Sequence, residues 1–163
     1  MTVTLRPASP GDAGILERLM QLYMHDFSSF SDTRIDDEGQ FNYPYLNHYW
    51  AEPDRFPFLF HASGRLAGFV LVRREQDPEN LASYMSVAEF FILRGERRKS
   101  TGANAAALVW GEFPGPWRLR VMPGNTRGLA FWRSALASAG ATDLVEEKEA
   151  ETGTTCFRFI AGV

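Results

Sequence analysis

The chain has 163 residues, 45% of them hydrophobic and 23% charged, which suits a single globular domain spanning residues 1–163. Its formal net charge of −3 does not suit a nucleic-acid binder, whose affinity depends on many phosphate contacts. No apolar run reaches membrane-spanning length and no early signal segment is present, so we expect a cytoplasmic protein with no membrane partner.

The first third of the chain predicts one strand and two helices. Residues 2–6 alternate between apolar and polar side chains, as a half-buried strand does. The Ser-Pro-Gly-Asp segment at 9–12 is typical of a helix start, and apolar residues follow at helical spacing over 15–23. Periodicity is lost near 31–39, where we expect a loop, and a short helix is expected over about 44–50.

The rest of the chain predicts six more strands and two more helices. The expected strands cover 57–62, 65–73, part of 82–93, 117–121 and two segments within 142–160, and the expected helices cover 101–113 and about 125–140. A long antiparallel run followed by a β-α-β unit indicates an α/β (α+β) fold. Its sheet should be mixed, mainly antiparallel and six- to seven-stranded, with helices on both faces.

A basic turn lies between the strand ending at Leu93 and the helix expected from Thr101. Residues 97–102 read Arg-Arg-Lys-Ser-Thr-Gly, so cationic side chains precede a helix start whose N–H groups have no intrahelical partner. Such a turn can bind a phosphate-bearing ligand. The same residues could equally form a solvated charged loop. A second motif, further along the chain, favours ligand binding.

Residues 125–132 read Asn-Thr-Arg-Gly-Leu-Ala-Phe-Trp. Together the two stretches resemble the GNAT superfamily of acyl-CoA-dependent N-acetyltransferases. The first is similar to that family's pyrophosphate-binding pattern through Arg97, Ser100 and Gly102. The second is similar to its Asn-x-x-Ala-x-x-Phe-Tyr pattern through Asn125, Gly128, Phe131 and Trp132.

Three residues depart from the family patterns. Ser100 replaces a usual glycine and Gly128 a usual alanine, and both changes keep a small residue. Trp132 stands where the family often has a tyrosine, which changes the chemistry available at that position.

The resemblance implies acetyl-CoA as cosubstrate, held between splayed fourth and fifth strands. It implies backbone contacts from the basic turn to the pyrophosphate and strand pairing with the pantetheine arm. The implied coenzyme-binding residues are Phe91, Ile92, Leu93, Arg97, Arg98, Lys99, Ser100, Thr101, Gly102, Ala103, Asn125, Phe131 and Trp132. Asn125 also has a simpler role as a helix cap, and Phe131 could serve in the core.

Glu89 is the candidate catalytic base. It lies in an otherwise apolar strand, where a carboxylate is costly unless it is paired, solvated in a cleft or protonated. Many members of the family that the chain resembles place a glutamate in this strand to accept the amine proton. The alternatives are an exposed carboxylate on an edge and a structural partner of an arginine. Glu89, Phe91 and Leu93 should face one side of the sheet.

The group that protonates the leaving thiolate is not identified. The indole N–H of Trp132 donates hydrogen bonds but is no practical acid near neutral pH. Four tyrosines in the chain are available donors, although a structural or substrate-lining role is favoured for each: Tyr43, Tyr45, Tyr49 and Tyr84.

Other reactive residues carry weaker indications. Cys156 is the only cysteine, so no intrachain disulfide can form, and its strand setting favours a small buried hydrophobe over a nucleophile. His48 could be a second base, but a surface or packing role is favoured. No metal-ligand spacing is present, so we expect no metal.

The leading hypothesis is an N-acetyltransferase that moves the acetyl group of acetyl-CoA to an amine by direct attack. The acceptor would be a small molecule or a peptide, and the resemblance leaves a homodimer open. A non-catalytic acyl-CoA-binding sensor or regulatory module is the alternative, and Trp132 is the residue that keeps it open. A nucleotide-binding domain is disfavoured because no P-loop sequence is present.

The acidic, aromatic stretch over about 23–50 suggests a cleft for a cationic amine with an apolar part, although a solvated acidic loop is equally compatible. Its acidic residues are Asp26, Asp32, Asp36, Asp37 and Glu38.

Overall fold

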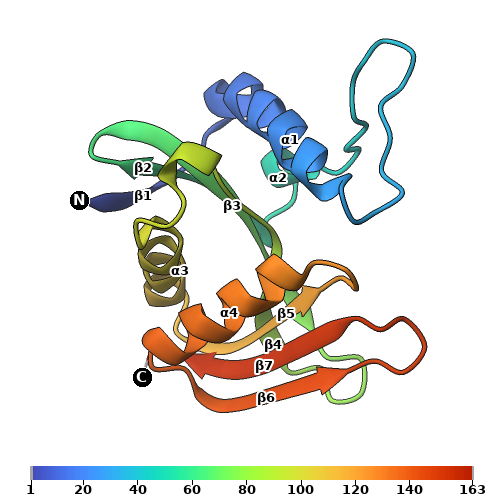
Figure 1. The fold of residues 1–163 in the computed structure, drawn as a ribbon. Helices are drawn as coiled ribbons and strands as arrows, with labels where there is room; N and C mark the ends of the chain where they lie inside the picture. The colour runs from blue at the N-terminus through green and yellow to red at the C-terminus, as the bar shows by residue number, and fades with distance from the viewer. Residues whose placement is uncertain (1, 163) are drawn as a thin grey trace.

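The computed structural model describes residues 2–162 and contains the secondary-structure elements in the predicted order (Figure 1). The strands are β1 (Val3–Pro7), β2 (Arg55–Ala62), β3 (Arg65–Gln76), β4 (Ser83–Ile92), β5 (Gly115–Val121), β6 (Thr142–Lys148) and β7 (Thr155–Ala161). The α-helices are α1 (Ala13–Phe27), α2 (His48–Ala51), α3 (Thr101–Glu112) and α4 (Thr126–Ser138), and the short 3-10 helices are η1 (Pro10–Asp12) and η2 (Arg94–Glu96).

The strands form one seven-stranded sheet in the order β1-β2-β3-β4-β5-β7-β6. Only the β4–β5 pair is parallel among the described strands, and the other neighbours are antiparallel. The predicted mixed, mainly antiparallel sheet is therefore confirmed. Within residues 2–162 no helix combines the length and apolar character needed to cross a lipid bilayer.

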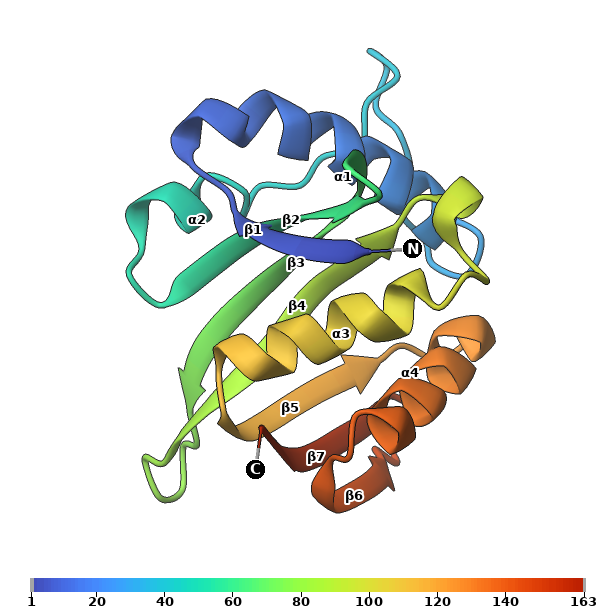
Figure 2. The same cartoon turned by 90° about the vertical axis from the view of Figure 1, so that its left-hand side faces the viewer.

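Helices cover both faces of the sheet, as expected (Figures 1 and 2). On one face, α3 and α4 bury an aromatic-rich cluster that includes Trp110, Trp117 and Phe157. On the other face, α1 and α2 bury a smaller cluster that includes Leu16, Met20 and Phe69. Burial of these side chains is the main favourable contribution to folding.

Two element boundaries differ from the sequence prediction by three residues or more. Strand β3 continues to Gln76, which pairs with Ser83, so the turn begins at Asp77, whose carboxylate accepts the N–H of Glu79 at 2.9 Å. The second helix starts at His48 rather than near residue 44. The residues before it form only i to i+3 turns, such as the bond from the Tyr49 N–H to the Leu46 carbonyl at 3.1 Å.

The two parallel strands diverge after three residue pairs. Strands β4 and β5 pair over Met85–Val87 and Trp117–Leu119, and the ladder then stops although β4 continues to Ile92. Figure 2 shows the carboxyl ends of the two strands running apart. The splayed pair that the family resemblance implies is present, and the edge of β4 beyond Val87 is free to pair with another extended chain.

A β-bulge in β4 decides which way its polar residue faces. Leu71 of β3 is opposite Glu89, but the next residue, Val72, is opposite Val87, so Ala88 is an extra residue. Val87 packs in the cluster under α3 and α4, whereas Glu89 hydrogen-bonds Tyr23 of α1. Simple alternation would have put Glu89 on the same face as Val87. The bulge therefore turns Glu89 to the α1 face.

Candidate functional site

Two tyrosines hold Glu89 at the fork between β4 and β5. The Tyr23 hydroxyl donates to Oε2 of Glu89 at 2.5 Å, and the Tyr43 hydroxyl donates to Oε1 at 3.2 Å. No arginine forms an ion pair with this carboxylate among the described residues, so the alternative of a structural Glu–Arg pair is not what the structure contains. As predicted, Phe91 and Leu93 belong to the same face as Glu89.

Burial raises the pKa of Glu89 above its ordinary value, and the hydrogen bonds from Tyr23 and Tyr43 partly oppose that rise. Burial and the neighbouring carboxylate likewise raise the pKa of both tyrosines, so both hydroxyls stay protonated as donors. A carboxylate with a raised pKa, anchored by neutral donors, is suited to accept a proton near neutral pH.

The raised pKa predicts a pH-dependent difference in stability between the wild type and Glu89→Gln. Below about pH 4.3, the pKa of an unfolded glutamate, Glu89 is protonated whether the chain is folded or not. As the pH rises through the folded-state pKa, ionisation of the buried group is expected to cost the wild type stability that the variant keeps. Thermal unfolding of both proteins from pH 4 to 8 measures the difference, and parallel curves would contradict the assignment.

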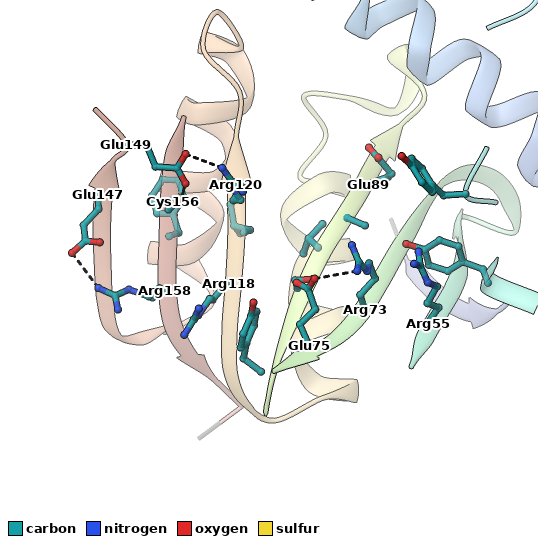
Figure 3. Close-up of a pocket in the computed structure, with 18 of the residues that line it drawn as sticks. Arg55, Arg73, Glu75, Glu89, Arg118, Arg120, Glu147, Glu149, Cys156 and Arg158 are labelled. Atoms are coloured by element: carbon teal, nitrogen blue, oxygen red, sulfur yellow. Dashed lines mark hydrogen bonds and ion pairs between the residues drawn. The ribbon is translucent and has the colours of Figure 1, made fainter. Parts of the chain in front are cut away.

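Glu89 lies in an open cleft of about 880 Å³ on the α1 face of the sheet (Figure 3). Residues from β2 to β7 and from the segment before α2 line it. All four tyrosines considered as donors line the cleft, namely Tyr43, Tyr45, Tyr49 and Tyr84. Its arginines are Arg55, Arg73, Arg118, Arg120 and Arg158.

The acidic stretch does not form this cleft. Asp26 pairs with arginines after β4, the Asp36 carboxylate accepts N–H groups of its own loop, and Asp32 is exposed. Asp37 and Glu38 are likewise exposed and outside the described lining. The expectation of an acidic cleft is therefore wrong, because these carboxylates are local loop caps and solvated groups while β-strand arginines point into the cleft.

The turn between β4 and α3 presents consecutive backbone donors. Arg98 and Ser100 both have positive φ, at 63° and 61°. Within residues 2–162, the N–H groups of residues 98–103 donate to no protein acceptor, and Ser100 makes no side-chain cap at the helix start. The Oγ1 of Thr101 is also buried without a partner. Successive free N–H groups at a helix N-terminus form a cradle suited to a diphosphate.

The cationic side chains of this turn contribute less free charge than the sequence suggests. Arg94 and Arg97 both bind Asp26 of α1, each with an Nη2 to carboxylate distance of 2.5 Å. Nε of Arg97 also donates to the Ile92 carbonyl at 2.7 Å. Lys99 lies 3.7 Å from Glu96. Arg98 is exposed and makes no ion pair within the described chain.

Gly102 packs so closely against α4 that a side chain here would displace the Phe131 ring. A Cβ at this position would lie 2.8 Å from Cε2 of Phe131 in α4. Because Gly102 has no side chain, the N-terminus of α3 can lie directly against Phe131.

We expect Gly102→Ala to lower the free energy of unfolding by about 1–3 kcal/mol, the usual cost of overpacking. Because the Phe131 ring is the obstacle, Phe131→Leu should recover part of that loss in the double variant. Chemical denaturation of the wild type, both single variants and the double variant measures the coupling. Additive losses would show that the ring is not what excludes the methyl group.

Asn125 caps α4 in the way its simpler role predicts. Its Oδ1 accepts the N–H of Gly128 at 2.9 Å. A Cβ on Gly128 would lie 2.4 Å from Nδ2 of Asn125. Gly128, where the family that the chain resembles has alanine, therefore lets the Asn125 side chain lie closely over the first turn of α4.

The other predicted coenzyme-binding residues do not lie on one surface. Some lie on opposite faces of the sheet at the end of β4, and others lie in the aromatic core under α3 and α4. Phe91 and Leu93 lie on the α1 face, and Ile92 lies under α3 and α4. Phe131 stacks on Phe90 with ring centroids 5.6 Å apart. Trp132 is 8% exposed, and its ring centroid lies 4.9 Å from that of Phe90. The structure therefore places the indole in the aromatic core.

Tyr23 is the residue of the candidate site that the sequence did not single out, because its helical spacing marks it only as a core position. Cys156 lines the cleft, half-buried, and its thiol donates to Oε1 of Glu149 at 3.1 Å. Burial raises its pKa, so the reactive thiolate is disfavoured. His48, half-buried on α2, is partnered by Glu52 just after that helix. No cluster of three His, Cys, Asp or Glu side chains suits a metal among residues 2–162.

Acetyl-CoA fits this arrangement in two respects. The free N–H groups of residues 98–103 and the unpartnered Thr101 hydroxyl suit a diphosphate. The unpaired edge of β4 beyond Val87 suits the amide-bearing pantetheine arm.

Comparison with known proteins gives structural neighbours only. No protein-family model and no curated protein sequence matches the chain. An acetyltransferase from Thermus thermophilus is similar over 97% of this chain and 96% of its own, with 17% identity and a TM-score of 0.68. An aminoglycoside acetyltransferase solved with coenzyme A has 14% identity over 98% of this chain and 95% of its own, with a TM-score of 0.65.

The GNAT domain of PAT from S. lividans is also similar, with 16% identity over 98% of this chain and 91% of its own, and a TM-score of 0.64. The strand order, the splayed β4–β5 pair and these likenesses agree. The chain therefore has the fold of the GNAT acetyltransferases, as its two motifs predict.

Proposed function

We propose that the protein is an N-acetyltransferase that moves the acetyl group of acetyl-CoA to an amine of a small molecule or peptide by direct attack. The observation that carries the proposal is Glu89, a largely buried carboxylate held by two tyrosines at the fork of β4 and β5. A general base placed there, with a raised pKa, is what deprotonation of an acceptor ammonium requires.

The chain's own groups would divide the work as follows. Acetyl-CoA, when bound, supplies the activated thioester. Glu89 accepts the proton of the acceptor ammonium, directly or through water, so that the nitrogen can attack as a neutral base. Tyr23 and Tyr43 orient the carboxylate and favour its ionised form. After attack, the C–S bond breaks and the acceptor nitrogen loses a second proton, which can pass to the leaving thiolate because Trp132 is no practical acid. Glu89 returns the first proton to solvent.

The coenzyme would be held mainly by backbone. Residues 98–103 would bind the pyrophosphate, and residues 91–93 would pair with the pantetheine arm. Asn125, Phe131 and Trp132 would support the site from α4, through the helix cap and the aromatic packing described above. The coenzyme A complex of the aminoglycoside acetyltransferase, which shares the fold, supports this assignment.

Thiol release from acetyl-CoA in the presence of an amine panel tests the activity, and calorimetry with coenzyme A tests binding separately. We expect binding and amine-dependent thiol release. Binding without turnover of any amine would favour the non-catalytic acyl-CoA-binding module. No binding at millimolar coenzyme A would reject both functions while leaving the fold unaffected.

A further inference from the structure

Tyr49 brings an unsatisfied polar group to the cleft that contains Glu89. The residue is 4% exposed, it lines the cleft, and its buried hydroxyl donates to no acceptor, although the Arg55 guanidinium lies beside it. A buried hydroxyl without a partner costs free energy, so such groups in native proteins call for an explanation. A ligand atom that accepts a hydrogen bond from the Tyr49 hydroxyl would explain why the protein tolerates this buried group.

Two arginines face the same part of the cleft. Arg55 of β2 and Arg73 of β3 are directly opposite each other in the antiparallel register, and both line the cleft. Like charges placed directly across a pair of strands are destabilising. The guanidinium carbon of Arg55 also lies 5.3 Å from the centroid of the Tyr49 ring. Three hydrogen-bond donors therefore gather here around the same space.

Each arginine keeps free donors after its own ion pair. Nε of Arg55 bonds Glu52 at 2.5 Å, and Nη2 of Arg73 lies 3.2 Å from Glu75. A guanidinium has five N–H donors, so several on each residue stay available. Burial raises the pKa of Tyr49 to about 12, against the opposing effect of the two arginines, so its hydroxyl is a donor at neutral pH.

This cluster lies close to the proposed base. Glu89 is opposite Leu71 in the register, and Arg73 is two residues further along β3 on the same face, about 7 Å away along the strand. Figure 3 shows Arg55 and Arg73 side by side on neighbouring strands, with Glu89 further along β4. A ligand group bound by the arginines would thus be only a few bonds from a nitrogen at Glu89.

We propose that the acceptor is an amine that also carries a carboxylate, as an amino acid does, and that Tyr49, Arg55 and Arg73 bind the carboxylate. This inference rests on the proposed acetyltransferase function and names its substrate class. The two guanidinium groups and the phenol hydroxyl offer several donors to the two oxygens of a carboxylate, the geometry of a bidentate arginine contact. A phosphate dianion would need more positive charge than two arginines already paired with Glu52 and Glu75 supply.

Matched acceptors test the proposal. The panel is the standard amino acids, each compared with its own amide, with ethanolamine and phosphoethanolamine added, and kcat/KM is measured by thiol release. We expect at least one amino acid to exceed its amide by about 10-fold or more, the scale of a hydrogen bond to a charged group. Equal use of acids and amides, or preference for phosphoethanolamine, would overturn the carboxylate assignment.

Three variants localise the effect. Tyr49→Phe removes only the unpartnered hydroxyl, and Arg73→Gln removes one guanidinium. Both are expected to reduce the ratio of kcat/KM for acid over amide, chiefly through KM. Arg158→Gln is the matched control, because Arg158 lines the same cleft from β7 and is paired with Glu147. An unchanged ratio in Tyr49→Phe and Arg73→Gln would overturn the subsite.

A binding measurement separates this proposal from the proposed function. If coenzyme A binds but no amine is acetylated, the catalytic assignment fails. The same amino acids are then titrated into the coenzyme A complex by calorimetry. Binding that Tyr49→Phe and Arg73→Gln weaken, but Arg158→Gln does not, would still support a carboxylate subsite. No binding of any amino acid would reject it.

Discussion

Replacement of Glu89 by glutamine is expected to lower kcat by about 100- to 10,000-fold, the usual contribution of a general base. Coenzyme A affinity should be unchanged, because Glu89 faces α1 and the cleft rather than the turn before α3. The wild-type rate should rise with pH as Glu89 ionises, and that ascending limb should flatten in the variant. Steady-state kinetics across pH and coenzyme calorimetry provide both measurements.

Glu147→Gln is the matched control for this experiment. Glu147 lines the same cleft but lies on exposed β6, paired with Arg158 at 3.1 Å. The same chemical change there should leave kcat within about twofold, since the charge is distant from the fork and screened by solvent. Equal losses in the two glutamine variants, or no loss in Glu89→Gln, would assign Glu89 a structural role.

Trp132→Ala is expected to lower the free energy of unfolding by about 3–5 kcal/mol, because a large side chain in the aromatic core is replaced by a cavity. Trp132→Phe should cost much less and keep most of the activity, since packing against Phe90 and Phe131 is largely retained. Urea denaturation and thiol release measure the two effects.

The phenylalanine variant also tests the passive role of the indole. Loss of all its activity, with fold and coenzyme affinity intact, would mean that the indole N–H contributes to the reaction. Trp132→Tyr restores the residue common in the family that the chain resembles. If it creates turnover that the wild type lacks, the natural protein is better described as a coenzyme binder.

The order of elements could be predicted from sequence because it depends on local signals. Alternation identified β1, and the Ser9–Asp12 helix start preceded α1 as expected. Errors occurred where pairing with another strand decides a boundary, as at Gln76, which is extended because Ser83 pairs with it. Such pairing has no signature within the segment itself.

The candidate site was also predictable only in part, because some of its features depend on local sequence and others on contacts between distant segments. Glu89 stands out in sequence because a carboxylate interrupts an apolar strand, but its direction depends on the bulge at Ala88. The register of the neighbouring strand creates that bulge. The partners of Glu89, Tyr23 and Tyr43, are 66 and 46 residues away in sequence. The sequence around a tyrosine on an apolar helix face or in a loop does not indicate which residue its hydroxyl will contact.

The double attachment of Arg94 and Arg97 to Asp26 has a consequence for coenzyme recognition. Two cations that could have met the diphosphate instead tether the turn to α1, so the cost of ordering it is met on folding rather than on binding. Attraction for the coenzyme then depends mainly on fixed backbone dipoles and on Arg98. Added salt should therefore weaken coenzyme A binding only slightly, and calorimetric titrations between about 50 and 500 mM sodium chloride would measure that shallow slope.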